Sequence, residues 1–227
     1  MFDFSPVFDN SGELLRGFWA TLRLAAASAV LSLIIGTILV CFRVAPVPIM
    51  RAFGTGYVNI VRNTPLTLVL LTCSLGLNDV LALKFSDNTS TTYYWWAVVG
   101  LSAYTGAFVC ETLRSGINTI PLGQAEAARS IGLTSAQSLR MIILPQAFRS
   151  IIAPMGSVLI AMIKNTTVAS AASYGEVAAV TKSIVDKPSF ADGVIPLFLG
   201  VAIAFLALTL PTGYFFGWLA KRMAVAR

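Results

Sequence analysis

Two basic residues, Arg62 and Lys164, lie in or beside long apolar runs and are the first candidates for chemistry. A charge near the middle of a bilayer costs on the order of 2.5–3.5 kcal/mol on insertion scales, so such a residue needs a partner or a watery path. Pro65 breaks the helix just after Arg62. Interrupted helices that line a cavity are typical of transport sites in membrane proteins.

A polar patch follows Lys164 directly. We expect its side chains to line a translocation path, with Arg62 or Lys164 supplying positive potential to a carboxylate. The predicted pathway residues are Arg62, Thr64, Lys164, Asn165, Thr166 and Thr167. Two alternatives remain open: Arg62 extends to the membrane interface, or Lys164 pairs with a carboxylate such as Glu111.

The composition excludes several classes of protein. Hydrophobic residues make up 56% of the 227 residues and charged residues 11%, less than half of the roughly 25% of a soluble domain. There is no histidine, which excludes histidine-based nucleophilic triads and HExxH zinc sites. The three cysteines are far apart, and we expect neither a disulfide framework nor a metal site. With no acid–base pair within a span, an intramembrane enzyme is disfavoured.

Gaps between charged residues predict a single all-α integral membrane domain over residues 1–227, with five transmembrane helices. The predicted spans cover residues 18–42, 57–78, 92–112, 148–172 and 194–219, and a loop covers 114–146. Basic residues gather in the segments after the first, third and fifth spans, and acidic residues dominate the other side. Because cytoplasmic loops carry excess Lys and Arg, we expect the N-terminus outside and the C-terminus inside.

The third span carries small residues at four-residue spacing, Ser102 with Gly106 and Ala103 with Ala107. Such spacing lets helix backbones approach closely in lipid. We interpret it as a packing feature.

The long inward loop predicts two short helices. Pro121 is suited to a helix start, and Gly132 to a left-handed cap at the end of the first helix. Thr134 and Gln137 form a capping box that opens the second helix, which we expect Pro145 to end. A short helix exposed between two spans predicts a docking site for another protein.

The spacing within this loop resembles the EAA loop of bacterial ABC importer permeases. Glu126-Ala127-Ala128, three residues, Gly132, nine residues, Ile142, one residue and Leu144-Pro145 match that pattern without a gap. The segment 57–65 (YVNIVRNTP) resembles the aromatic-V-x-x-x-R-G-T-P stretch of the polar amino acid branch, which serves histidine, glutamate, glutamine and arginine. Asn63 replaces its usual glycine. The segment 164–168 (KNTTV) is similar to that branch's K-D/N-T/S-S-L stretch.

The resemblance covers the whole chain and implies the type I ABC importer permease fold. It implies that the helix around Glu126 is a coupling helix that docks on an ATPase subunit. The coupling residues would be Glu126, Ala127, Ala128, Gly132, Leu144 and Pro145. It also implies a second permease, which we expect to be a different sister chain, and an external solute-binding protein. The chain has no GxxxxGK[ST] motif, so we expect ATP and magnesium on the partner ATPase and no cofactor on this transport subunit.

The substrate prediction depends on one position. Relatives with Asp after this lysine include importers of basic amino acids, whereas Asn165 leaves the stretch net positive. This favours an acidic or neutral amino acid, and we expect glutamate, with glutamine or aspartate as alternatives, imported across the bacterial cell membrane. Two other classes stay open: a stand-alone ion-driven secondary transporter, and an assembly or sensor subunit.

Overall fold

The computed structural model describes residues 4–187 and 193–223, and the regular elements in these ranges are all helical. Within these ranges, four helices are long and apolar enough to cross a membrane, and a bent pair could form a fifth span. The long helices are α2 (Ser11–Val44), α5 (Thr89–Asn118), α8 (Leu144–Asn165) and α10 (Val194–Met223). The bent pair consists of α3 (Pro48–Arg62) and α4 (Leu66–Leu71), which continues into the π-helical η1 (Thr72–Val80).

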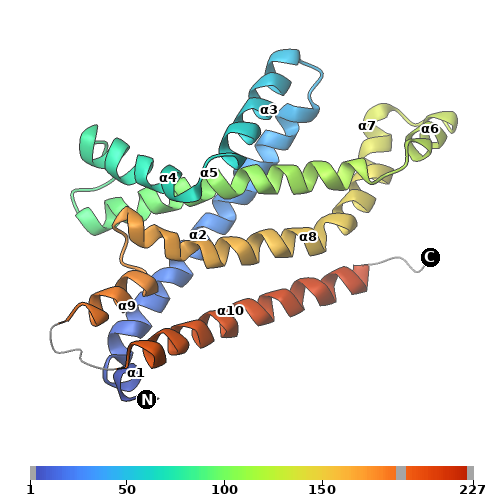
Figure 1. Cartoon of the computed structure of the whole chain (residues 1–227). Helices are drawn as coiled ribbons and strands as arrows, with labels where there is room; N and C mark the ends of the chain where they lie inside the picture. The colour runs from blue at the N-terminus through green and yellow to red at the C-terminus, as the bar shows by residue number, and fades with distance from the viewer. Residues whose placement is uncertain (1–3, 188–192, 224–227) are drawn as a thin grey trace.

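The shorter helices connect or extend the long ones. They are α1 (Ser5–Asp9), α6 (Leu122–Ser130), α7 (Ser135–Ser138), the π-helical η2 (Leu139–Ile143), the 3₁₀-helical η3 (Thr166–Ala172) and α9 (Val177–Val185). Figure 1 shows α5, α8 and α10 with nearly parallel axes, α8 running antiparallel to the other two, and α2 crossing them at a steep angle. The helices α6 and α7 lie at one end of the bundle with the last turn of α10, and α1 and α9 lie at the other. We call these the α6 end and the α9 end.

The second predicted span is broken where the sequence predicts it. The axis bends by 105° between α3 and the helix that starts at Leu66. Pro65 is the N-cap residue of that helix, with extended backbone (φ −60°, ψ 135°). Proline also disfavours helical backbone in the residue before it, so the chain cannot pass through Thr64 and Pro65 as a continuous helix.

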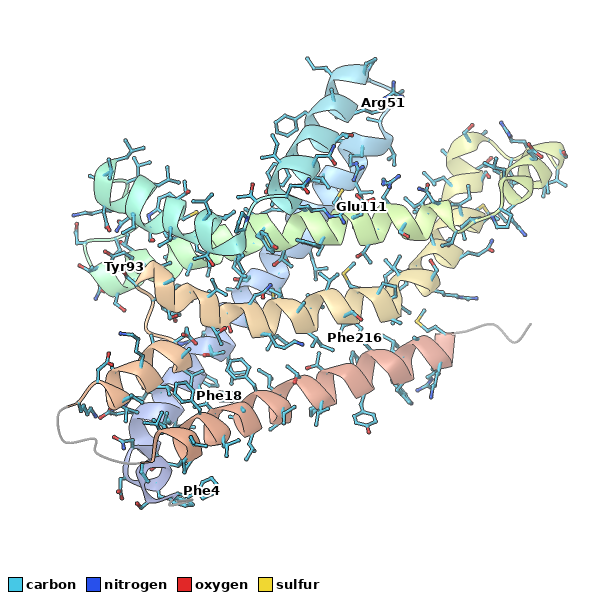
Figure 2. All side chains as sticks on the ribbon, in the orientation of Figure 1. Phe4, Phe18, Arg51, Tyr93, Glu111 and Phe216 are labelled. Carbon is cyan, nitrogen blue, oxygen red and sulfur yellow. The ribbon has the colours of Figure 1, made fainter. Side chains whose placement is uncertain are left out.

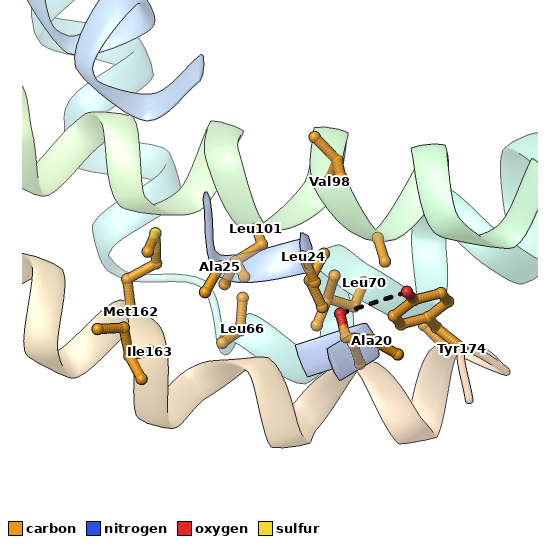
Figure 3. Packing of buried hydrophobic residues seen from close by; sticks show 13 residues of the cluster. Ala20, Leu24, Ala25, Leu66, Leu70, Val98, Leu101, Met162, Ile163 and Tyr174 are labelled. Atoms are coloured by element: carbon orange, nitrogen blue, oxygen red, sulfur yellow. Dashed lines mark hydrogen bonds between the residues drawn. The ribbon is translucent and has the colours of Figure 1, made fainter. Parts of the chain in front are cut away.

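The main apolar core joins four helices near the α9 end. Leu24 of α2, Leu70 of α4 and Leu101 of α5 are fully buried there, and Met162 of α8 is almost so. Figure 3 shows these side chains converging, with the hydroxyl of Tyr174 donating a hydrogen bond of 3.4 Å to the carbonyl of Ala20. In contrast, Pro196 and Leu197 are the only buried residues of α10 within the described part of that helix. Its apolar side chains are therefore free to face lipid.

Small residues let α2 and α5 cross closely, as their spacing predicts. Ser102 is fully buried, and its hydroxyl donates a hydrogen bond of 3.4 Å to the carbonyl of Ser28. A Cβ at Gly106 would lie 2.7 Å from Cγ2 of Ile35, so only glycine fits at this crossing. The same contact includes Gly36, whose missing side chain leaves room for Val109.

Candidate functional site

The helix α6 forms an exposed projection at one end of the bundle. It starts after Pro121 and ends at Ser130, close to the predicted bounds. Only Ala128 is buried in it, at 3% exposure, and the helix packs on α7 and η2. Glu126 and Ala127 are exposed. Ala128 therefore anchors α6 to the permease, while Glu126 and Ala127 remain accessible.

A Schellman motif ends α6. Gly132 has φ +87°, its N–H donates to the carbonyl of Arg129 (2.9 Å), and the N–H of Leu133 donates to the carbonyl of Ala128 (3.1 Å). This left-handed turn satisfies the last carbonyls of the helix and is easy only for glycine. The predicted role of Gly132 as a cap is confirmed.

The predicted capping box is also present. The hydroxyl of Thr134 accepts a hydrogen bond from the N–H of Gln137, whose side chain accepts one from the N–H of Thr134. The expectation that Pro145 ends the second helix is wrong. Pro145 lies in the first turn of α8, and the chain is helical from Ser135 to Ala172. Proline is tolerated there because η2 uses π-helical hydrogen bonds just before it and the first turn of α8 needs no N–H from Pro145.

Apolar side chains surround the projection. Leu122 and Ile131, at the two ends of α6, are 82% and 76% exposed, and Met141 in η2 is 63% exposed. Leu144 is also exposed, at 43%. Exposed apolar residues gathered at one end of a protein are typical of a protein interface.

A cluster of charges lies where α2, α3 and α5 meet. Glu111 of α5 is bound by the guanidinium groups of Arg43 from α2 and Arg114 from its own helix. Arg62, the last residue of α3, is further away, with its Nη1 atom 3.7 Å from Oε2 of Glu111. Its guanidinium carbon lies over the ring of Phe108 at 5.5 Å from the centroid. Figure 2 shows Glu111 on the side of α5 that faces the hairpin of α2 and α3.

Two pockets follow the groove between α5 and α8. The Glu111 pocket, of about 310 Å³, lies toward the α6 end and is lined by Arg62, Phe108, Glu111, Thr112, Ser115, Gly116, Thr119, Ser150, Ile151, Pro154 and Val158. The Asn165 pocket, of about 370 Å³, is lined by Tyr104, Thr105, Phe108, Ser157, Val158, Ala161, Met162 and Asn165. Both volumes are at the lower end of the range for small-molecule sites.

The predicted pathway residues are divided by the structure. Arg62 and Asn165 line the two pockets. Lys164 is exposed at the end of α8. Thr166 is fully buried, and its hydroxyl donates to the carbonyl of Ile163 (2.6 Å).

The remaining two threonines form similar bonds within their own helices. Thr167 donates to the carbonyl of Lys164 (2.9 Å), and Thr64 donates to the carbonyl of Ile60 (2.8 Å). Neither threonine lines either pocket. Glu111, the carboxylate considered as a partner for Lys164, is instead bound by arginines.

Sequence reasoning missed three features of this region. Arg114 lies three residues after Glu111 on one helix, a spacing that predicts an ion pair. The contact of Arg43 with Glu111 joins two helices and has no such signal. Phe108 and Tyr104 line the Asn165 pocket. They precede Glu111 by three and seven residues and therefore share its face of α5, but the sequence alone does not show which face lines the pocket.

Comparison with known proteins identifies the family of this chain. The model of the family described as "Binding-protein-dependent transport system inner membrane component" matches residues 24–225. The chain belongs to this family. This binding-protein-dependent permease is therefore a multi-pass membrane protein and a component of an ABC importer. The assignment disfavours the stand-alone ion-driven transporter.

Similar proteins agree with the assignment. The permease is 47% identical over 224 residues to the glutamate transport system permease protein GluC of Corynebacterium efficiens, with 96% of this chain and 97% of that protein covered. It is 31% identical to the probable glutamine ABC transporter permease protein GlnM of Bacillus subtilis, with 96% and 97% covered.

A solved chain of an amino acid ABC transporter with histidines superimposes with a TM-score of 0.87 at 22% identity, covering 98% of this chain and 99% of that one. This match confirms the predicted type I ABC importer permease fold.

Proposed function

We propose that this permease is the transmembrane subunit of an ATP-driven importer that carries glutamate and forms half of the translocation pathway. The main observation in support of glutamate as the substrate is the 47% identity, over nearly the whole chain, to a permease named for glutamate transport. The local chemistry supports it, because none of the described residues that line the Asn165 pocket has a carboxylate. An anionic substrate would meet no like charge there.

The exposed helix α6 is proposed to dock on the ATPase. Its accessible Glu126 and Ala127, the apolar ends at Leu122 and Ile131 and the rigid turn at Gly132 support this role. ATP and magnesium would be held by the partner ATPase, and this chain would supply no catalytic group. Alternating access then requires that ATPase closure favours one permease conformation over the other through this contact.

The topology proposed for the importer has the α6 end in the cytoplasm and the N-terminus outside. Arg129, Arg140, Lys221 and Arg222 are at the α6 end together with Glu126. Asp9, Asp87, Glu176 and Asp186 are in segments at the other end together with Lys182 and Lys187. This distribution follows the rule that positive charges stay inside. A solute-binding protein would deliver the substrate at the α9 end, and a second permease, proposed to be a sister chain, would complete the pathway.

The test has two stages. The tagged chain is purified from its native membranes in mild detergent, and the proteins retained with it are identified by mass spectrometry. We expect an ATPase and a second permease. The complex is then reconstituted in vesicles with its binding protein, and ATP-dependent uptake of labelled glutamate is measured with aspartate, glutamine and arginine as competitors. A chain that is reproducibly isolated alone would contradict the importer, and stronger competition by glutamine or aspartate than by unlabelled glutamate would change the substrate.

A further inference from the structure

The Glu111 pocket and the Asn165 pocket meet at a shared wall. Both are lined by Phe108 of α5 and Val158 of α8. The first pocket continues to Thr119 and Ser150 near the α6 end, and the second continues to Asn165 near the other end. A solute that moves along the groove between α5 and α8 must therefore pass Phe108.

The charge around Glu111 is not balanced. Three guanidinium groups, those of Arg43, Arg62 and Arg114, surround one carboxylate and leave a net charge of +2. Arg43 and Arg114 bind the two carboxylate oxygens directly. Arg62 is thus not needed to neutralise Glu111, and its positive charge is available to a further anion.

Arg62 is the least tightly held of the three. Its nearest distance to Glu111 is 3.7 Å, beyond hydrogen-bonding range, and its side chain is 43% exposed. It lines the pocket, whereas Arg43 and Arg114 do not. Its contact with the face of Phe108 fixes the guanidinium beside the shared wall without using its donors. Those donors can therefore bind a carboxylate in bidentate geometry.

Away from the arginines, the part of the pocket toward the α6 end is lined by hydroxyl groups that can accept hydrogen bonds from an ammonium group. The hydroxyl of Thr119 donates to the carbonyl of Gly116 (2.7 Å), and that of Ser150 donates to the carbonyl of Ala147 (2.8 Å). Thr112 similarly donates to the carbonyl of Phe108 (2.9 Å). Because these hydrogens are directed to backbone carbonyls, each hydroxyl oxygen keeps a lone pair that can accept a hydrogen bond from a cation, and the oxygens of Thr119 and Ser150 lie 3.3 Å apart.

We propose that the Glu111 pocket is a second amino acid site, occupied after the Asn165 pocket on the way to the α6 end. Arg62 binds a carboxylate of the amino acid, the hydroxyls of Thr119 and Ser150 bind its ammonium group, and Phe108 separates the two sites. This inference depends on the proposed function for its substrate class. It assigns Arg62 a step that follows delivery by the binding protein.

The test uses the reconstituted complex with its binding protein, and measures initial uptake of labelled glutamate at varied concentrations of the loaded binding protein. Because Arg43 and Arg114 still neutralise Glu111, Arg62→Met is expected to assemble normally. We expect kcat to fall at least tenfold with KM unchanged, since delivery takes place at the other end. Arg62→Lys keeps the positive charge but cannot bind a carboxylate in bidentate geometry, so we expect it to retain part of the wild-type kcat. Thr119→Val is expected to lower kcat as well.

Arg51→Met is the matched control, because Arg51 is on the same helix but far from the pocket (Figure 2). It is expected to leave both constants unchanged. A wild-type kcat in Arg62→Met would overturn the second site. A loss of both kcat and assembly that is the same in Arg62→Met and Arg62→Lys would also overturn it. Lack of glutamate uptake by the wild-type complex would instead overturn the proposed substrate.

Discussion

The hydroxyl of Thr21 in α2 accepts a hydrogen bond of 3.2 Å from the backbone N–H of Val177, the first residue of α9. Glu176 precedes Val177 and is fully buried. Its carboxylate caps α9 by accepting hydrogen bonds from the N–H groups of Ala178 (2.9 Å) and Ala179 (3.0 Å). The attachment of α9 to α2 thus involves a carboxyl group that is shielded from water.

Burial raises the pKa of Glu176 from 4.5 to about 7, while the two backbone N–H groups and Thr21 oppose this shift. A folded-state pKa above the unfolded one means that the folded protein binds the proton more tightly. This contribution to stability is complete below pH 4.5 and is lost as the pH rises to about 7. The shift corresponds to roughly 3 kcal/mol at most.

We therefore expect the thermal midpoint of the purified permease to fall between pH 5 and about 7.5, and Glu176→Gln to remove most of this fall. The difference between the two proteins isolates Glu176 from other titrating groups. Asp186→Asn is the control, because Asp186 is exposed at the end of α9 and pairs only with Lys182 in the described contacts. A pH dependence in Glu176→Gln that equals that of the wild type would contradict this account.

The crossing of α2 and α5 predicts a clear effect of one methyl group. In Gly106→Ala, the new Cβ would lie 2.7 Å from Cγ2 of Ile35 and 3.1 Å from its Cβ, so the helices must separate. Overpacking of this kind costs about 1–3 kcal/mol. We expect a thermal midpoint several degrees lower, whereas Gly56→Ala, which meets open space inside α3, should unfold at or slightly above the wild-type temperature. Equal midpoints for the two variants would show that the crossing is not tightly packed.

Sequence patterns within a few residues predict the turns and caps of the loop and the apolar spans. Contacts between residues far apart in the sequence determine the features that these patterns do not predict. The capping box of Thr134 and the left-handed Gly132 are determined by neighbours within a few residues, so they can be read from the sequence. The expectation for Pro145 is wrong because a proline can either end a helix or begin one, and here a π-helical turn precedes it and leads into α8. The binding of Glu111 by Arg43 joins residues 68 positions apart, and no local pattern encodes it.

Asn165 is expected to control the preference for substrate charge. Asn165→Asp places a negative charge in a pocket whose lining otherwise has none, and like charges at close range cost several kcal/mol. We expect glutamate uptake to fall more than tenfold while glutamine uptake falls much less. The measurement is the ratio of the two initial rates in vesicles. An unchanged ratio would mean that substrate charge is not read at Asn165.

Lys164 is expected to supply positive potential beside Asn165 from its exposed position at the end of α8. Lys164→Met should abolish most glutamate uptake and leave assembly with the ATPase intact. Lys182→Met, which removes an exposed lysine of α9, is the control and should transport normally. Normal uptake by Lys164→Met would exclude Lys164 from the pathway.

Gly132 is expected to couple the permease to its ATPase through backbone conformation alone. Among the described residues, no atom outside the helix and its chain neighbours lies within 4 Å of the position a Cβ would take, so a side chain has room here. The φ of +87° nevertheless strains any residue other than glycine. Left-handed backbone costs roughly 1–2 kcal/mol for an ordinary residue, and a β-branched residue tolerates it least. Gly132→Val should therefore break the two hydrogen bonds that end α6 and turn its exposed face away from the ATPase.

This free-energy cost corresponds to about 5- to 30-fold weaker binding of the ATPase, and we expect slower transport as well. Gly132→Asn is expected to lie between Gly132→Val and the wild type, because asparagine tolerates the left-handed region better than valine. Gly217→Val, in the ordinary helical backbone of α10 with open space around it, controls for the added side chain. Retention of the ATPase is measured by co-purification and transport by uptake. If Gly132→Val matches Gly217→Val in both, the turn at Gly132 does not position the coupling helix.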